Sequence, residues 1–143
     1  MTRRKKCGRF GWLLIVLTIA ALIMRILGCF WGLPLQLHPD EPATVDYAIE
    51  MLSRHSWMAQ SFDRPDHFEI KCDAILFTLF SWLRYHQSAY TAFQSHAHAF
   101  YLVARIFTAL FGTALVPMTA LFTQAVLKKR DRRDQETAAL VAA

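Results

Sequence analysis

The sequence predicts an all-α polytopic membrane protein fragment, with two transmembrane helices, two juxtamembrane helices in the first outside loop and the start of a third span. The chain of 143 residues is 55% hydrophobic and only 19% charged, which is too apolar for an ordinary soluble domain. Two apolar runs are long enough to cross a bilayer, and a cluster of basic residues abuts each of them.

The charges are segregated along the chain. Basic clusters occupy the first nine residues and residues 128–133, whereas residues 32–98 hold eight acidic residues, four basic residues and all six histidines. Basic clusters at both ends could also suit a soluble nucleic-acid binder, but the positive-inside tendency explains them together with the apolar runs. We therefore predict a lipid bilayer as partner and no nucleic acid, with residues 32–98 outside.

The first predicted span follows a basic cytoplasmic N-terminus at residues 1–11. Residues 12–31 carry Arg25 as their single charge, and 20 residues of helix extend about 30 Å, the thickness of a hydrocarbon core. Arg25 either reaches toward the headgroups or faces an anionic lipid-linked ligand. A cleavable signal peptide is the competing interpretation of this run.

The outside loop is predicted at residues 32–98, with surface helices at 42–54 and 73–86. In the first, apolar side chains recur at helical spacing, and Glu50 and Arg54 are spaced for an i, i+4 pair. Residues 55–73 show no clear period and are predicted to form a polar loop. The apolar segment at 74–83 is too short to span a bilayer.

The second predicted span covers residues 99–127, and Pro117 is expected to kink it locally. A cytoplasmic basic loop follows at 128–136. Residues 137–143 resemble the start of a truncated third span, so we expect the chain to be part of a larger membrane protein.

The motif around which the chain is organised is His38-Pro39-Asp40-Glu41-Pro42. Carboxylates at the start of a helix commonly cap backbone N–H groups and favour the positive end of the helix dipole. The functional alternative is a general base at the membrane boundary, placed beside a good leaving group such as a phosphate.

Other side chains in the outside loop are weaker candidates for binding. Arg64, Lys71 and Arg105 could hold phosphate oxygens, although Arg105 could equally extend from the end of its span toward the headgroups. The sequence specifies no cofactor. A divalent cation is one option, for which His38 and His67 are weak candidate ligands, together with the acidic pair and Asp66, Glu69 and Asp73.

The order of these features resembles the start of the GT-C glycosyltransferases, and within them family 39, which holds protein O-mannosyltransferases and lipid A aminoarabinose transferases. The resemblance lies in Asp40-Glu41, supported by Tyr47, Ala48, Met51 and Leu52. It implies many more spans and transfer of a sugar from a polyprenyl-phosphate donor to an extracytoplasmic acceptor at the bacterial plasma membrane. It further implies that Asp40 acts as the base with Glu41 beside it.

The sequence departs from the family where many relatives carry His-Pro-Pro or Tyr-Pro-Ser, because residues 64–71 stand there instead. This departure leaves the sugar and the acceptor open. The resemblance also implies that this fragment alone is inactive. The alternative from another class is a small non-enzymatic two-span membrane protein whose outside loop binds a partner or a metal ion.

Overall fold

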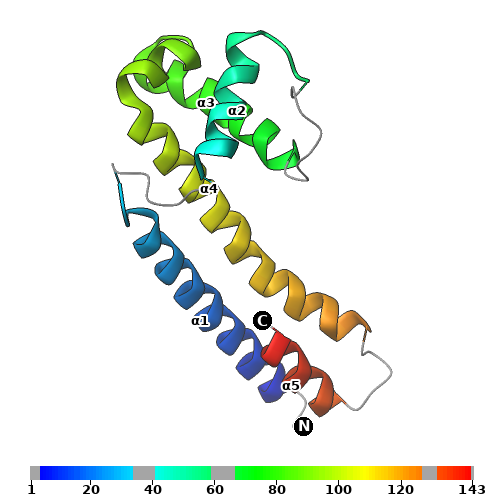
Figure 1. Cartoon of the computed structure of the whole chain (residues 1–143). Coiled ribbons are helices and arrows are strands. Elements are labelled where there is room, and N and C mark those ends of the chain that lie inside the picture. Colours follow the sequence, from blue (N-terminus) through cyan, green and yellow to red (C-terminus); the bar gives the residue numbers. More distant parts are fainter. Residues whose placement is uncertain (1–3, 34–40, 59–66, 127–131, 143) are drawn as a thin grey trace. The chain divides into compact units, whose positions relative to one another are not determined.

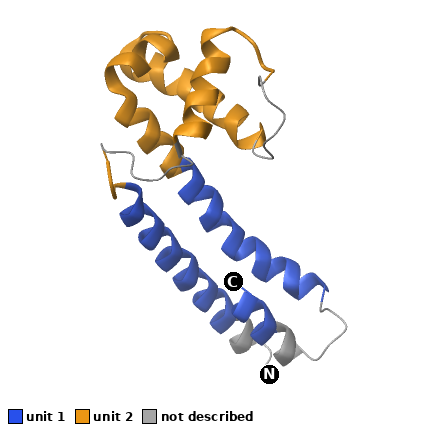
Figure 2. Ribbon diagram, in the orientation of Figure 1, with its two compact units in different colours: residues 1–29, 107–143 blue, residues 30–106 orange. Residues whose placement is uncertain are grey.

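The computed structural model describes residues 4–33, 41–58, 67–126 and 132–142, and every regular element in these ranges is an α-helix. The helices are α1 (Arg4–Cys29), α2 (Glu41–Ser53), α3 (His67–Tyr85), α4 (Ala89–Val126) and α5 (Arg132–Ala142) (Figure 1). This confirms the predicted all-α class. The chain divides into two compact units, with residues 1–29 and 107–143 in unit 1 and residues 30–106 in unit 2 (Figure 2).

Two of the described helices are long and apolar enough to cross a membrane: α1 between Gly8 and Cys29, and α4. The large apolar side chains of α1 are exposed around its circumference, and Leu13, Ile23 and Leu27 are all more than half exposed. A helix that is apolar on every face and uncovered by protein matches the composition of a span in lipid.

Unit 1 has a narrow interior built from small side chains. On α4, Ala109, Thr113, Val116 and Ala120 are buried at spacings of three and four residues, so they form one stripe. The Thr113 hydroxyl donates to the Ala109 carbonyl at 2.7 Å, which satisfies its polar group within the helix. Small residues allow close helix approach, which is the usual way that apolar helices associate in membranes.

Helix α4 is interrupted at a residue that the sequence does not indicate. The helix continues through Pro117, and the residue inside it with non-helical dihedral angles is His96 (φ −137°, ψ 35°). The His96 ring stacks on Tyr85 with centroids 4.5 Å apart and planes 4° from parallel. This stacking contact joins the end of α3 to the point at which α4 changes direction.

Unit 2 contains a core to which α2, α3 and the first part of α4 all contribute. Helix α2 corresponds to the helix predicted at 42–54, and its Val45, Ala48 and Ile49 are buried as their spacing indicates. The described core residues are Val45, Ala48, Ile49, Met51, Ile70, Ala74, Phe77, Ala89, Ala92, Phe100, Tyr101 and Ala104.

Helix α3 starts at His67, inside the segment predicted as a polar loop. Its buried face comprises Ile70, Asp73, Ala74, Phe77 and Ser81, and the apolar members follow helical spacing. Glu69 lies in the first turn, where a carboxylate favours the positive end of the helix dipole. Because this face packs against the core, the helix extends into the segment predicted as a loop. The polar residues of that segment obscure the helical spacing of its apolar residues.

Phe100 is the centre of the aromatic part of this core. Its ring makes edge-to-face contacts with Phe77, Phe80 and Phe93, with centroids 5.3–5.5 Å apart. Each such pair contributes about 0.5–1.5 kcal/mol beyond the burial of its area. Because Phe77 and Phe80 belong to α3 while Phe93 and Phe100 belong to α4, these contacts hold the two helices together.

Two helices of unit 2 end with a histidine in the left-handed conformation, at His55 (φ 51°) and His86 (φ 53°). After α2, Ser56 N–H donates to the Met51 carbonyl and His55 N–H to the Leu52 carbonyl, which is the Schellman pattern. Glycine usually occupies this position because it has no Cβ to clash.

Candidate functional site

Helix α2 begins within the acidic motif that the sequence singles out. The helix begins at Glu41, directly after Asp40. His38, Asp40, Arg64 and Asp66 lie outside the described residues, and so does the side chain of Glu41. The described part of α2 is anchored in the core by Val45, Ala48 and Ile49, which lie one to two turns after Glu41.

A hydrogen bond between helices fixes α2 near this end. The buried Tyr101 hydroxyl on α4 donates to Oδ1 of Asp46 at 3.2 Å. Asp46 itself is exposed, so its carboxylate faces solvent while it accepts this bond. An open hollow of about 420 Å³, lined by Ala43, Asp46, Tyr47 and Glu50, lies along the same helix.

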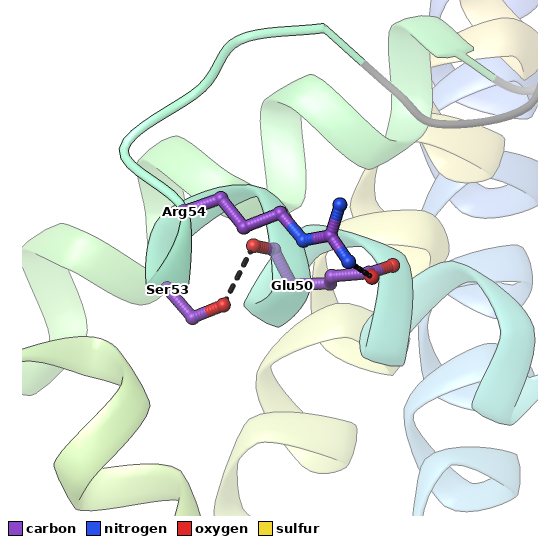
Figure 3. A network of polar contacts seen from close by, with 3 residues as sticks. All are labelled: Glu50, Ser53 and Arg54. Carbon is purple, nitrogen blue, oxygen red and sulfur yellow. Dashed lines mark hydrogen bonds and ion pairs between the residues drawn. The ribbon is translucent and has the colours of Figure 1, made fainter.

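The second carboxylate of this hollow is neutralised locally. The Glu50 carboxylate forms an ion pair with Arg54 at 2.7 Å, as the i, i+4 spacing predicts (Figure 3). The Ser53 hydroxyl donates a hydrogen bond to the Glu50 backbone carbonyl at 2.8 Å. Both side chains are partly exposed, so this pair contributes only a few tenths of a kcal/mol to stability.

Asp73 is the most perturbed ionisable group among the described residues. It is 1% exposed, and its Oδ1 has no hydrogen-bond partner within the described part of the chain. Burial in this apolar surrounding, with a smaller contribution from Glu69, raises the pKa of Asp73 from 3.8 to about 7. A carboxyl with a pKa near neutrality can carry a proton at physiological pH.

The remaining predicted site residues lie in distinct surroundings. Lys71 is exposed on α3, and His67 is the first residue of that helix. Arg105 donates to the Trp31 carbonyl at 2.6 Å within unit 2, so one of its N–H groups is used in holding the chain before α2. The structure therefore gives Arg105 a structural contact that the sequence does not indicate.

The weak metal hypothesis gains no ligand cluster from the described residues. No group of three or more His, Cys, Asp or Glu side chains is placed to hold a metal ion within the ranges that the structure covers. Asp73 and Glu69 both belong to α3, and Asp73 faces the core.

Sequence reasoning overlooked the buried position of Asp73. The signal that could reveal it is the spacing of Ile70, Ala74 and Phe77, which places residue 73 on the apolar side of a helix once the helix is extended to His67. A loop over residues 55–73, as the sequence predicts, would place none of these side chains on a helix face.

Comparison with protein-family models, with curated proteins and with solved structures finds no match to this chain.

Proposed function

We propose that this chain is the N-terminal part of an integral-membrane glycosyltransferase of the bacterial plasma membrane. In this proposal the complete enzyme transfers a sugar from a polyprenyl-phosphate donor to an extracytoplasmic acceptor. Asp40 serves as the base that receives the acceptor hydroxyl proton, and Glu41 helps to orient the acceptor.

The observation that carries the proposal is the position of the acidic motif. Helix α2 begins at Glu41, and its opposite end is anchored by a core that belongs to unit 2 alone. In sequence, α2 lies between the two apolar helices of spanning length. A carboxylate at the start of such a helix, next to a membrane, is suited to a lipid-linked donor whose phosphate is the leaving group.

The resemblance also implies that the displacement inverts the sugar carbon. Asp40 accepts a proton from the attacking hydroxyl as the new glycosidic bond forms, and the bond between the sugar carbon and the phosphate oxygen breaks. The departing polyprenyl phosphate is stable as an anion, so a carboxylate of ordinary basicity suffices if it is well placed. Lys71 and Arg64 are the cations proposed to approach the phosphate.

The decisive experiment is Asp40→Asn in the protein joined to the further spans that the resemblance implies. Transfer should fall by at least about a hundredfold, as expected for loss of a general base, while membrane insertion stays unchanged. Asp63→Asn is the matched control, because it makes the same chemical change elsewhere in the predicted outside segment. Unchanged transfer in Asp40→Asn would remove this residue from the mechanism and favour the non-enzymatic alternative.

The proposed topology has its own test. In a variant without the native cysteines, a single cysteine at position 63 should react with an impermeant maleimide added outside intact cells. A cysteine at position 131 should react only after the membrane is opened. The reverse pattern would show that unit 2 lies on the cytoplasmic side, where the proposed reaction would not take place.

A further inference from the structure

Two hollows in unit 2 share a wall at the C-terminal end of α2. The first has a volume of about 310 Å³ and the second about 440 Å³, and Leu52, His55 and Thr78 line both. The two hollows therefore adjoin, and together they are here called the C-terminal groove. Its described lining comprises Met51, Leu52, Ser53, His55, Ser56, Trp57, Ala74, Thr78, Ser81, Trp82, Gln87, Ser88, Ala89 and Tyr90.

The lining of the C-terminal groove is mostly apolar, with a few hydrogen-bonding side chains among the apolar ones. None of its lining residues is Asp, Glu, Lys or Arg, so neither a phosphate nor an ammonium group would find an opposite charge there. Its polar groups are instead hydroxyls, the Gln87 amide and the His55 imidazole, which donate and accept hydrogen bonds without a net charge. The lining therefore favours a neutral ligand that has apolar faces as well as hydrogen-bonding groups.

Two exposed hydroxyls of the C-terminal groove, those of Thr78 and Ser53, are oriented to accept hydrogen bonds. Thr78 donates its proton to the Ala74 carbonyl at 2.8 Å. Ser53 likewise donates to the Glu50 carbonyl at 2.8 Å. With their protons committed to helix carbonyls, these oxygens present lone pairs, and a ligand that supplies many O–H donors is their natural complement.

Three large aromatic side chains in the C-terminal groove are open to solvent. Trp82 is 63% exposed, Trp57 58% and Tyr90 47%. Flat aromatic faces beside hydrogen-bonding groups match a sugar ring, which has apolar C–H faces and hydroxyls around its edge. Exposed aromatics within a hollow are also the side chains that supply most binding energy in protein recognition.

His55 joins the two halves of the C-terminal groove from a position that is costly for its residue type. Its backbone is left-handed, a conformation disfavoured by about 1–2 kcal/mol for residues with a Cβ. A glycine would end α2 at lower cost but would place no imidazole between the hollows. Strained backbone positions of this kind concentrate at functional sites.

We propose that the C-terminal groove binds a neutral carbohydrate, with the sugar ring against Trp82 or Trp57 and its hydroxyls on Thr78, Gln87 and His55. Helix α2 separates this groove from the acidic motif by about 18 Å of helix rise. Its role as a holding site for an extended glycan acceptor rests on the proposed function. The binding itself does not.

The test measures binding of neutral oligosaccharides of glucose, mannose and galactose to the 143-residue chain in phosphatidylcholine nanodiscs. In the background Trp12→Phe/Trp31→Phe, the two remaining tryptophans, Trp57 and Trp82, report from the groove. We expect a saturable change in their emission with at least one of the three probes. Trp82→Ala should lower the affinity for that oligosaccharide by about tenfold or more, and Trp82→Phe should retain most of the affinity.

The matched control is Trp12→Ala, tested by calorimetry in the otherwise unaltered chain, because Trp12 is 70% exposed on α1 and outside the groove. Its affinity should equal that of the parent chain. If Trp82→Ala fails to fold, Gln87→Ala serves instead, because Gln87 is exposed and its loss should weaken binding severalfold.

Three results would overturn the proposal: no binding of any probe, equal affinity in Trp82→Ala, or strong quenching of Trp57 and Trp82 by lipids brominated in their acyl chains. The last result would identify these aromatics as membrane-embedded. Because the readout is binding, a failed transfer experiment leaves the groove result standing, and a failed binding experiment leaves the transfer result standing.

Discussion

The hydroxyl of Tyr101 donates a hydrogen bond to Oδ1 of Asp46 across 3.2 Å, joining α4 to α2 from residues 55 positions apart. The Tyr101 ring is buried beside Phe93, whereas the Asp46 carboxylate is exposed. One end of the bond is therefore rigid and the other faces solvent. This arrangement sets the position of the helix that begins at the acidic motif.

Tyr101→Phe should lower the free energy of unfolding by about 1 kcal/mol, because it deletes one hydrogen bond and keeps the buried ring. Chemical unfolding in detergent, followed by circular dichroism, measures this change. Tyr90→Phe is the control, since Tyr90 is 47% exposed and should change stability by less than about 0.5 kcal/mol. Equal effects of the two substitutions would show that the Asp46 bond contributes nothing.

Asp73 makes the stability of unit 2 depend on pH. Its pKa is raised from 3.8 to about 7 on folding, so the folded state holds a proton that the unfolded state releases. Stability from this group is therefore complete below about pH 4 and is lost as pH rises to about 7. The loss is on the order of a few kcal/mol.

Asp73→Asn should abolish most of this slope and should be more stable than the parent chain at pH 8. Unfolding free energies measured from pH 4 to pH 8 for both proteins test this, and their difference cancels the titration of the histidines. Glu69→Gln should lower the pKa of Asp73 slightly, because Glu69 is the smaller cause of the shift. An unchanged slope in Asp73→Asn would exclude burial of an ionisable Asp73 carboxyl.

The sequence predicts the helical class and α2 well because both depend on local signals. Val45, Ala48 and Ile49 recur at helical spacing, and the apolar runs are long. The buried Asp73 and the stacking of His96 on Tyr85 depend instead on which helices meet in unit 2, and no local pattern encodes that choice. The C-terminal groove likewise combines residues from α2, α3 and α4, so its composition is visible only once the helices are packed.

His55→Gly tests whether the left-handed backbone of His55 at the end of α2 lowers the stability of the protein. The substitution should raise the unfolding free energy by up to about 1 kcal/mol, because glycine adopts φ 51° without steric cost. His98→Gly is the matched control: His98 is exposed within α4, so glycine there should destabilise by about 1 kcal/mol. Thermal unfolding separates the two directions, and destabilisation by both variants would contradict the steric argument.

The contact of Arg25 with Gly112 gives the last prediction, within unit 1. The Arg25 guanidinium donates to the Ala21 carbonyl at 3.3 Å, one turn toward the N-terminus, and its Nε lies 2.9 Å from the point that a Cβ on Gly112 would occupy. Gly112→Leu must therefore displace the Arg25 side chain from α4. We expect a lower midpoint of thermal unfolding in nanodiscs, and Arg25→Ala should relieve at least about 0.5 kcal/mol of that cost in a double-mutant cycle. Gly28→Leu is the control, because a Cβ at Gly28 meets nothing within 4 Å, and additive effects of Gly112→Leu and Arg25→Ala would refute the contact.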